Sequence, residues 1–195
     1  MMVKTKGEQK HYKYMVANLP SRDLDGTKTF VRRTHDGSLF FYQKTDDGIF
    51  RIAVKRRTDR EIKREASNQL IIPYPTEVGK LWGSETTTTI LDRKIRAYER
   101  KVFTLVTPVT LHYTVESLDD AVNVPAGYFD HCLHIRGVGH TRVNPNVRVG
   151  VTDIEIENIE WYAPGVGLVK MVRKEAASTA VLDSGEYVLE LESLQ

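Results

Sequence analysis

Hydrophobic and polar residues alternate with a period of two through much of this 195-residue chain, and long stretches of helical periodicity are scarce. Successive side chains of a strand point to opposite faces, so this pattern is typical of half-buried antiparallel strands. It is clearest where Val109, Leu111, Tyr113 and Val115 follow one another at every second position. We therefore predict a mainly β protein with little helix and about nine or ten strands.

The N-terminal half contains three β-rich runs between residues 27 and 57. They are separated by Asp36-Gly37 and Asp47-Gly48, dipeptides that supply the positive φ angles of tight hairpin turns. The runs predict a three-stranded meander. Residues 55–65 are rich in charge of both signs and fit either a longer third strand or a short helix. The expected inward side chains of the meander are Phe30, Phe40, Tyr42, Phe50, Ile52 and Val54.

The middle of the chain is interrupted by two prolines. Pro73 and Pro75 cannot sit in a central strand, because proline has no backbone N–H to donate, so we expect an ordered, extended crossing there. Residues 90–104 are ambiguous: a β-branched start favours a strand, whereas four apolar residues have helical spacing. A helix, an irregular loop and a continued strand all stay open for this segment.

Two hairpins are predicted in the C-terminal half, each around a turn that combines proline and glycine. One surrounds Pro125 and Gly127, and the other surrounds Pro164 with its two following glycines. Because open sheet edges invite aggregation, we expect one curved antiparallel sheet that forms a half-barrel or open barrel. The predicted organisation is a flexible N-terminal lead over residues 1–12 and a single antiparallel β domain over residues 13–195.

Charge and composition restrict the partners. The 28 basic and 26 acidic residues give a net charge of +2, so the sequence gives no reason to expect nucleic acid. No window approaches the roughly 18 continuous apolar residues of a membrane-spanning helix. A basic series between residues 51 and 64 includes Arg56, Arg57 and Arg60. These arginines are the candidate contact with an anionic surface such as acidic lipid headgroups; the alternative is a strand edge kept from pairing by charge.

Metal-binding and nucleophilic side chains gather at His131, Cys132, His134 and His140. Cys132 and His134 share a face of a strand, but spacing offers no third and fourth ligand, so we expect neither a metal nor a cofactor. Cys132 is the single cysteine, which excludes an internal disulfide. Its adjacent histidine faces the other way on a strand, so a buried apolar filler is the favoured interpretation of the thiol.

Three glutamates, Glu155, Glu157 and Glu160, are candidates for acid–base chemistry. Glu155 and Glu157 alternate with isoleucines, so we expect these two and Glu160 on the wet face of a half-buried strand. The sequence contains no phosphate-binding glycine loop, nucleophile elbow or zinc-protease helix. We therefore expect a protein that is not an enzyme, with a metal- or cysteine-dependent hydrolase as an alternative.

Three segments occur in a characteristic order: PYPTEVGKLW at 73–82, VNVPAGYFDHCLHI at 122–135 and EWYAPGVGLVK at 160–170. Together they resemble a family of uncharacterised bacterial envelope proteins, many of them lipoproteins, with VGxxW, VPAGxFxxCL and YAPGVGLVK motifs. The resemblance spans roughly residues 73–172. It implies a curved antiparallel sheet and no established catalytic residue. It also implies a periplasmic or envelope location if a leader was removed. If none was removed, we expect a cytoplasmic location.

The leading functional hypothesis is a non-enzymatic periplasmic or envelope protein that binds an apolar ligand or lipid on a concave sheet face. A second hypothesis is a protein–protein interaction or assembly module of the cell envelope, which pairs its C-terminal strand around Val188 with a partner. Simple packing is the alternative role for the two neighbouring aromatic residues at 161 and 162. The candidate ligand-binding residues are Phe40, Tyr42, Phe50, Tyr113, Trp161 and Tyr162.

Overall fold

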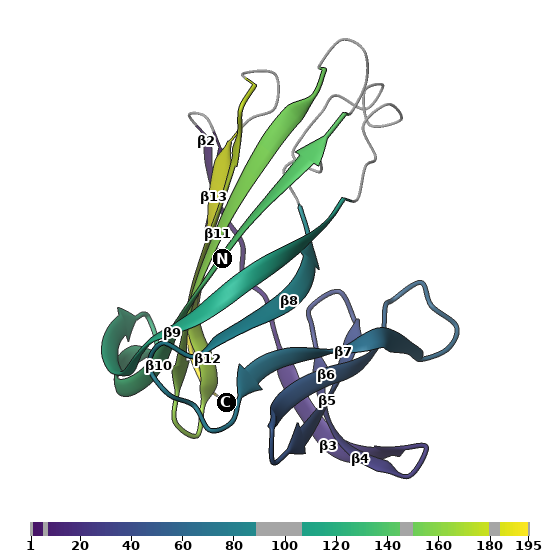
Figure 1. The fold of residues 1–195 in the computed structure, drawn as a ribbon. Helices are drawn as coiled ribbons and strands as arrows, with labels where there is room; N and C mark the ends of the chain where they lie inside the picture. The colour runs from purple at the N-terminus through teal and green to yellow at the C-terminus, as the bar shows by residue number, and fades with distance from the viewer. Residues whose placement is uncertain (1, 6–7, 89–106, 145–149, 180–183, 195) are drawn as a thin grey trace.

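The computed structural model describes residues 2–5, 8–88, 107–144, 150–179 and 184–194, with side chains from residue 12 onward. Within these ranges thirteen strands form two antiparallel sheets, and no helix occurs (Figure 1). The mainly β, antiparallel class is therefore confirmed. None of the described segments is a long apolar helix of the kind that crosses a membrane.

The smaller sheet has five strands in the order β3-β4-β5-β6-β7. The predicted meander forms its centre, β4 to β6. Gly48 starts β6 and has a φ of 148°; a Cβ there would lie 2.3 Å from the carbonyl oxygen of Ile72, so only glycine fits the close approach of β6 to β7. The strands are β3 Ala17–Leu24, β4 Thr27–Arg33, β5 Leu39–Thr45, β6 Gly48–Lys55 and β7 Lys63–Pro73.

The larger sheet has eight strands in the order β2-β1-β13-β12-β11-β10-β9-β8. Its six strands from β8 to β13 follow the chain order, and the two N-terminal strands extend it beyond β13. Val188 on β13 pairs with Val172 of β12 on one side and with Met2 of β1 on the other, so the C-terminal strand is not a sheet edge. The strands are β1 Met2–Thr5, β2 Glu8–His11, β8 Leu81–Thr87, β9 Pro108–Val124, β10 Gly127–Val143, β11 Thr152–Ala163, β12 Gly167–Ala177 and β13 Gly185–Glu190.

The expected single curved sheet, a half-barrel or open barrel, is wrong. The chain forms two sheets, and neither closes on itself. The first sheet ends at Pro73, residues 74–80 cross over, and β8 then pairs with β9 instead of with β7. The crossing around Pro73 and Pro75 agrees with the prediction. The division of the strands into two sheets could not be predicted, because the period-two pattern is the same whichever sheet a strand joins.

The predicted inward face of the meander is partly wrong. The small apolar core of the smaller sheet consists of Val31, Phe41, Ile52 and Ala53, with Phe50 packed against it. Phe30 is instead 53% exposed. The remaining predicted side chains, Phe40, Tyr42 and Val54, are half-buried. The run Leu-Phe-Phe-Tyr is apolar on both faces, and a register shift between Phe41 and Tyr42 breaks the alternation, so parity could not identify the core face.

The hairpins and the alternation of the C-terminal half are confirmed. Val109, Leu111 and Val115 are buried as predicted. Gly127, with a φ of 132°, follows the turn between β9 and β10, and Val124 lies opposite it. The turn between β11 and β12 is closed where Ala163 pairs with a glycine. The ambiguous segment at 90–104 lies outside the described residues.

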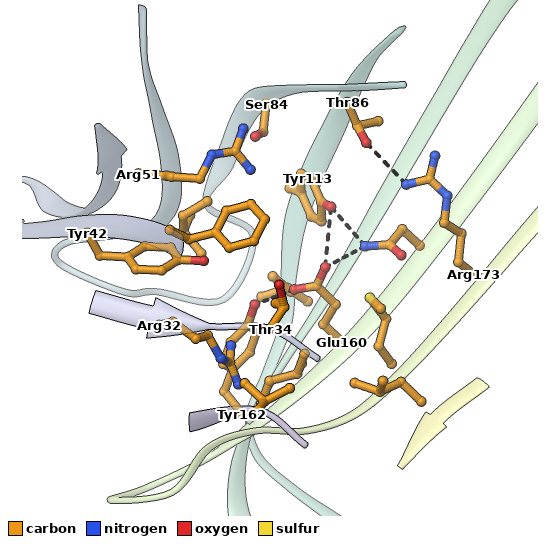
Figure 2. A pocket seen from close by; sticks show the side chains of 18 of the residues that line it. Arg32, Thr34, Tyr42, Arg51, Ser84, Thr86, Tyr113, Glu160, Tyr162 and Arg173 are labelled. Atoms are coloured by element: carbon orange, nitrogen blue, oxygen red, sulfur yellow. Dashed lines mark hydrogen bonds between the residues drawn. The ribbon is translucent and has the colours of Figure 1, made fainter. Parts of the chain in front are cut away.

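One face of β11 changes character along its length. Ile154 and Ile156 are buried in an apolar cluster together with residues of β9 and β10. The next positions on the same face are Asn158, Glu160 and Tyr162, because side chains alternate along a strand. The larger sheet therefore carries a polar strip where its first apolar cluster ends, and this strip faces the smaller sheet (Figure 2).

Candidate ligand-binding cavity

A cavity of about 970 Å³ lies between the two sheets (Figure 2). Its lining comes from β4 to β7 of the smaller sheet, from β8 to β13 of the larger sheet, and from the N-terminal segment that precedes β3. This volume is at the upper end of the range typical of pockets for small molecules, roughly 300–1,000 Å³. The site is therefore large enough for a ligand and draws on most of the fold.

The two sheets are joined at the side of this cavity by β7 and β8. The side-chain oxygen of Gln69 on β7 accepts a hydrogen bond of 2.9 Å from the backbone N–H of Glu85 on β8. Its amide nitrogen donates to the carbonyl of Ser67, also at 2.9 Å. Gln69 is only 7% exposed, so these bonds are shielded from water. A buried side-chain amide thus links two strands that do not pair through their backbones.

The wall formed by the larger sheet is centred on Glu160. Its carboxylate accepts hydrogen bonds of 2.5 Å from the hydroxyl of Tyr162 and of 2.5 Å from the side-chain nitrogen of Asn158. The hydroxyl of Tyr113 lies 3.5 Å from the same carboxylate and itself accepts a 2.9 Å bond from Asn158. These four residues make one hydrogen-bonded group, which Figure 2 shows in the middle of the cavity.

Burial governs the ionisation of this group. It raises the pKa of Glu160, although the bonds from Tyr162, Asn158 and Tyr113 favour the charged form. Burial, followed by the nearby charge of Glu160, raises the pKa of both tyrosines above the usual value. The side-chain oxygen of Asn158 is buried and has no hydrogen-bond partner among the described residues. The group therefore keeps one unsatisfied acceptor at the cavity wall.

Arg173 on β12 also belongs to this wall and is only 7% exposed. Its Nε donates to Glu175 at 2.8 Å, and its other nitrogens donate to the hydroxyl of Thr86 at 3.3 Å and to the carbonyl of Thr87 at 2.8 Å. The fully buried Glu175 also accepts a bond from the hydroxyl of Thr88. The guanidinium of Arg173 is thus used to fasten β8 to β12.

The wall formed by the smaller sheet carries Arg32, Tyr42 and Arg51 on the neighbouring strands β4, β5 and β6. Arg51 donates from Nε to Glu65 at 2.6 Å, and its guanidinium lies 6.0 Å from the ring centre of Phe40. Arg32 forms no ion pair with a described carboxylate, and its buried Nε has no hydrogen-bond partner. Arg32 of this wall therefore has one buried donor that no described group uses.

Tyr42 lies between these two arginines. Burial raises the pKa of its hydroxyl, and the charges of Arg32 and Arg51 act in the opposite direction. In Figure 2 all three side chains extend from the smaller sheet toward Glu160 and Tyr113 on the other wall. The charged groups of the two walls thus face each other across the cavity.

The rest of the lining is largely apolar and aromatic. The N-terminal segment contributes Tyr12 and Tyr14, and the ring of Tyr14 stacks on His35 at 3.8 Å. Lys13 in this segment forms an ion pair with Glu192 beyond β13, so the segment contacts both sheets. The aliphatic lining residues are Val16, Leu70, Ile71, Ile135, Leu168, Met171 and Leu189.

The structure brings four of the six candidate ligand-binding residues to this cavity. Phe40, Tyr42, Tyr113 and Tyr162 line it. Their role in binding stays a prediction. Phe50 packs against the core of the smaller sheet instead.

The sixth candidate, Trp161, points away from the cavity. Its ring stacks on His134 at 4.7 Å, and its indole nitrogen donates to Asp120 at 2.9 Å. The candidate anionic-surface residues Arg56, Arg57 and Arg60 are exposed between β6 and β7, outside the cavity lining.

Sequence reasoning missed Glu160, which was expected on the wet face with Glu155 and Glu157. Glu155 is exposed as expected, but Glu160 faces the cavity. The sequence contains a signal for this placement. Glu160 is an even number of residues from Ile154 and Ile156 and so shares their face of the strand, whereas Glu155 and Glu157 lie on the opposite face. Arg32 and Arg173 were missed as well, and no comparable sequence signal distinguishes them from the other arginines.

The histidine and cysteine cluster does not come together. Cys132 is fully buried in an apolar cluster of β9 to β12, where burial raises the pKa of its thiol. His131 pairs with Asp119, and the remaining two histidines pair with other aspartates. The pairing of β10 with β9 has register shifts around Cys132 and His134. Among the described residues no group of three metal-capable side chains is placed to hold an ion.

Comparisons of the chain with protein-family models, with curated proteins and with solved structures found no match. The resemblance carried by residues 73–172 therefore stays a prediction. The site itself is a large, mostly apolar space with an acid on one wall and the guanidinium of Arg32 on the other.

Proposed function

We propose that this protein is a non-enzymatic binding protein that holds an apolar or amphipathic ligand, such as a lipid, between its two sheets. The single observation that supports this most is the cavity of about 970 Å³, with its aromatic and aliphatic lining. Apolar groups gain free energy when such a surface removes them from water, at about 25 cal/mol per Å². A ligand with a hydrocarbon body fits this lining better than a purely polar one.

The polar groups of the larger-sheet wall support binding over catalysis. Glu160 is held by three hydrogen-bond donors, and Arg173 is fastened to Glu175 and to β8. Groups fixed in this way can set the orientation of a bound ligand. The periplasmic or envelope location that the resemblance implies belongs to the same proposal, and fractionation of cells that produce the full-length protein tests it.

The test uses a neutral fluorescent probe, N-phenyl-1-naphthylamine, whose emission rises in apolar surroundings. We expect saturable binding to the wild-type chain. Met171→Trp, which fills the cavity, is expected to weaken probe binding strongly because the added ring occupies its volume. Leu118→Trp is the matched control, since Leu118 is 42% exposed and does not line the cavity.

Native mass spectrometry of gently purified protein and solvent extraction of the same sample would reveal a ligand retained from the cell. Absence of saturable probe binding to the wild-type chain would contradict the proposal. Equal binding by the Met171→Trp and Leu118→Trp variants would also contradict it, because the probe would then occupy another surface.

A further inference from the structure

We propose that the ligand is a single-chain amphiphile with a carboxylate headgroup, and that Arg32 and the hydroxyl of Tyr42 bind this headgroup. This inference rests on the proposed function and names the class of its ligand. It is drawn from the smaller-sheet wall, where Arg32 and Tyr42 come from the adjacent strands β4 and β5.

The three arginines of the cavity differ in what they contact. Arg51 pairs with Glu65 and Arg173 pairs with Glu175, whereas Arg32 has no carboxylate partner among the described residues. The Nε of Arg32 is buried and donates to no described group. A buried donor without a partner costs about 1–3 kcal/mol. The Arg32 side chain as a whole is only half-buried, so a turn of this side chain would bring the Nε to an acceptor supplied by a ligand and recover this free energy.

A carboxylate matches this donor in shape. A guanidinium presents its N–H groups in a planar fork, and a carboxylate accepts two of them in parallel. The Tyr42 hydroxyl beside Arg32 offers a further donor, because a hydroxyl can rotate its proton toward the anion. Arg32 and Tyr42 together can therefore satisfy both oxygens of one carboxylate.

The charge balance favours a headgroup with one negative charge. Arg51 adds a second cation near Tyr42, but Glu65 already lies 2.6 Å from its Nε. Glu160 lies on the opposite wall, where its carboxyl faces the cavity. One available cation facing an acid accommodates a monoanion better than a doubly charged phosphate, which the acid would repel more strongly. The aliphatic lining is then left for the hydrocarbon chain.

The experiment measures how decanoic acid, decanol and decyltrimethylammonium displace N-phenyl-1-naphthylamine from the full chain. The three probes share a chain length and differ in headgroup charge. We expect the wild-type protein to bind the acid at least about tenfold more tightly than the alcohol, because charge-assisted hydrogen bonds are the strong ones. The ammonium compound is expected to bind more weakly than the alcohol.

Arg32→Gln is expected to lower the affinity for the acid by roughly ten- to a hundredfold and to leave the alcohol within about twofold. Arg33→Gln is the matched control: it lies next along β4, is exposed, makes the same change of charge and does not line the cavity. Tyr42→Phe provides a second variant, with a smaller selective loss for the acid, should Arg32→Gln fold poorly.

The outcomes separate the carboxylate inference from the proposed function on which it rests. Equal affinity of the wild-type chain for acid and alcohol, or equal losses for both in Arg32→Gln, overturns the carboxylate inference while the proposed function stands. Tightest binding of the ammonium compound overturns it too and makes Glu160 the headgroup site. If the neutral probe itself shows no saturable binding, the proposed function fails, and this inference fails with it.

Discussion

The two walls of the cavity use the same kinds of side chain, tyrosine and arginine, in different states of hydrogen bonding. On the larger sheet, Tyr113 and Tyr162 bond to Glu160, and Arg173 bonds to Glu175 and to β8. On the smaller sheet, Arg32 keeps a buried donor with no described partner. The larger wall keeps one unsatisfied acceptor, the side-chain oxygen of Asn158, but its charged groups are satisfied from within; the smaller wall keeps an unused donor on a charged group, which gains more from a ligand.

The two sheets also differ in the apolar cores that lie behind the walls. The larger sheet carries two separate apolar clusters, and its long strands extend well past the smaller sheet (Figure 1). The smaller sheet has one cluster of four buried residues. We therefore expect removal of the polar contacts in the larger wall to change mainly stability, and substitution of Arg32 or Tyr42 in the smaller wall to change mainly binding.

The largest effect is expected from Arg173→Met, which removes the cation beside the fully buried Glu175. Breaking a buried ion pair from one side costs about 3–5 kcal/mol, because the remaining charge stays in a poorly solvated site. Urea unfolding followed by fluorescence measures the loss. The neighbouring Lys174→Met is the control, since Lys174 is exposed and its pair with Glu157 contributes at most about 1 kcal/mol. Similar losses in both variants would refute the contrast.

A smaller loss, about 1–3 kcal/mol, is expected from Gly137→Val. A Cβ at Gly137 would lie 2.7 Å from the ring of Tyr113, so the ring would have to leave its place against Trp82 and in the Glu160 group. Gly83→Ala is the control, because its nearest contact, with Thr110, is at 3.4 Å. Thermal unfolding compares the two. Equal melting temperatures would show that the ring of Tyr113 can move aside without loss of stability and would contradict the prediction.

A pH-dependent effect is expected at Glu160. Burial raises the pKa of this acid, so the stability it contributes is fully present below the ordinary carboxyl value of 4.5 and is lost as pH rises through the raised pKa. Glu160→Gln cannot ionise, so its stability relative to the wild type should increase over that rise. Urea midpoints recorded from pH 4 upward test the trend. A constant difference between the proteins across the series would contradict it.

The smallest effect, under about 1 kcal/mol after allowance for solvent screening, is expected at Asp36 in the turn of the smaller sheet. Bonds from Thr34 and Ser38 lower its pKa to about 2. Its stabilisation is therefore present above the ordinary value of 3.8 and is lost as pH falls through about 2. Asp36→Asn should be less stable than the wild type at pH 7 and should approach it in acid. A difference between Asp36→Asn and the wild type that stays constant from pH 7 into acid would contradict this prediction.

Regular alternation and turn chemistry could be predicted from the sequence. Val109, Leu111 and Val115 define the buried face of β9 unambiguously, because polar residues separate them. The turns near Gly127 and Pro164 were predictable for a different reason, since few residue types adopt the required backbone angles. Both kinds of signal are local, and a single sequence expresses local signals directly.

What could not be predicted depends on contacts between distant strands. Nothing local distinguishes β7, which ends one sheet, from β8, which begins the other. Phe40 and Phe41 are adjacent and identical, and only the packing of the sheet decides which one is buried. The unused donor of Arg32 likewise depends on which carboxylates lie near it in space, and no pattern along the chain shows this.

The joint between the sheets has one more consequence. No backbone ladder runs from one sheet to the other among the described strands; the sheets are linked by Gln69 through its bond to Glu85, by the crossing at residues 74–80 and by residues 12–16 between β2 and β3. The spacing of the two walls is therefore set by one amide and two short pieces of chain. Selection or design can adjust the width of the binding space there, and so the thickness of the molecule it admits, while every strand keeps its neighbours.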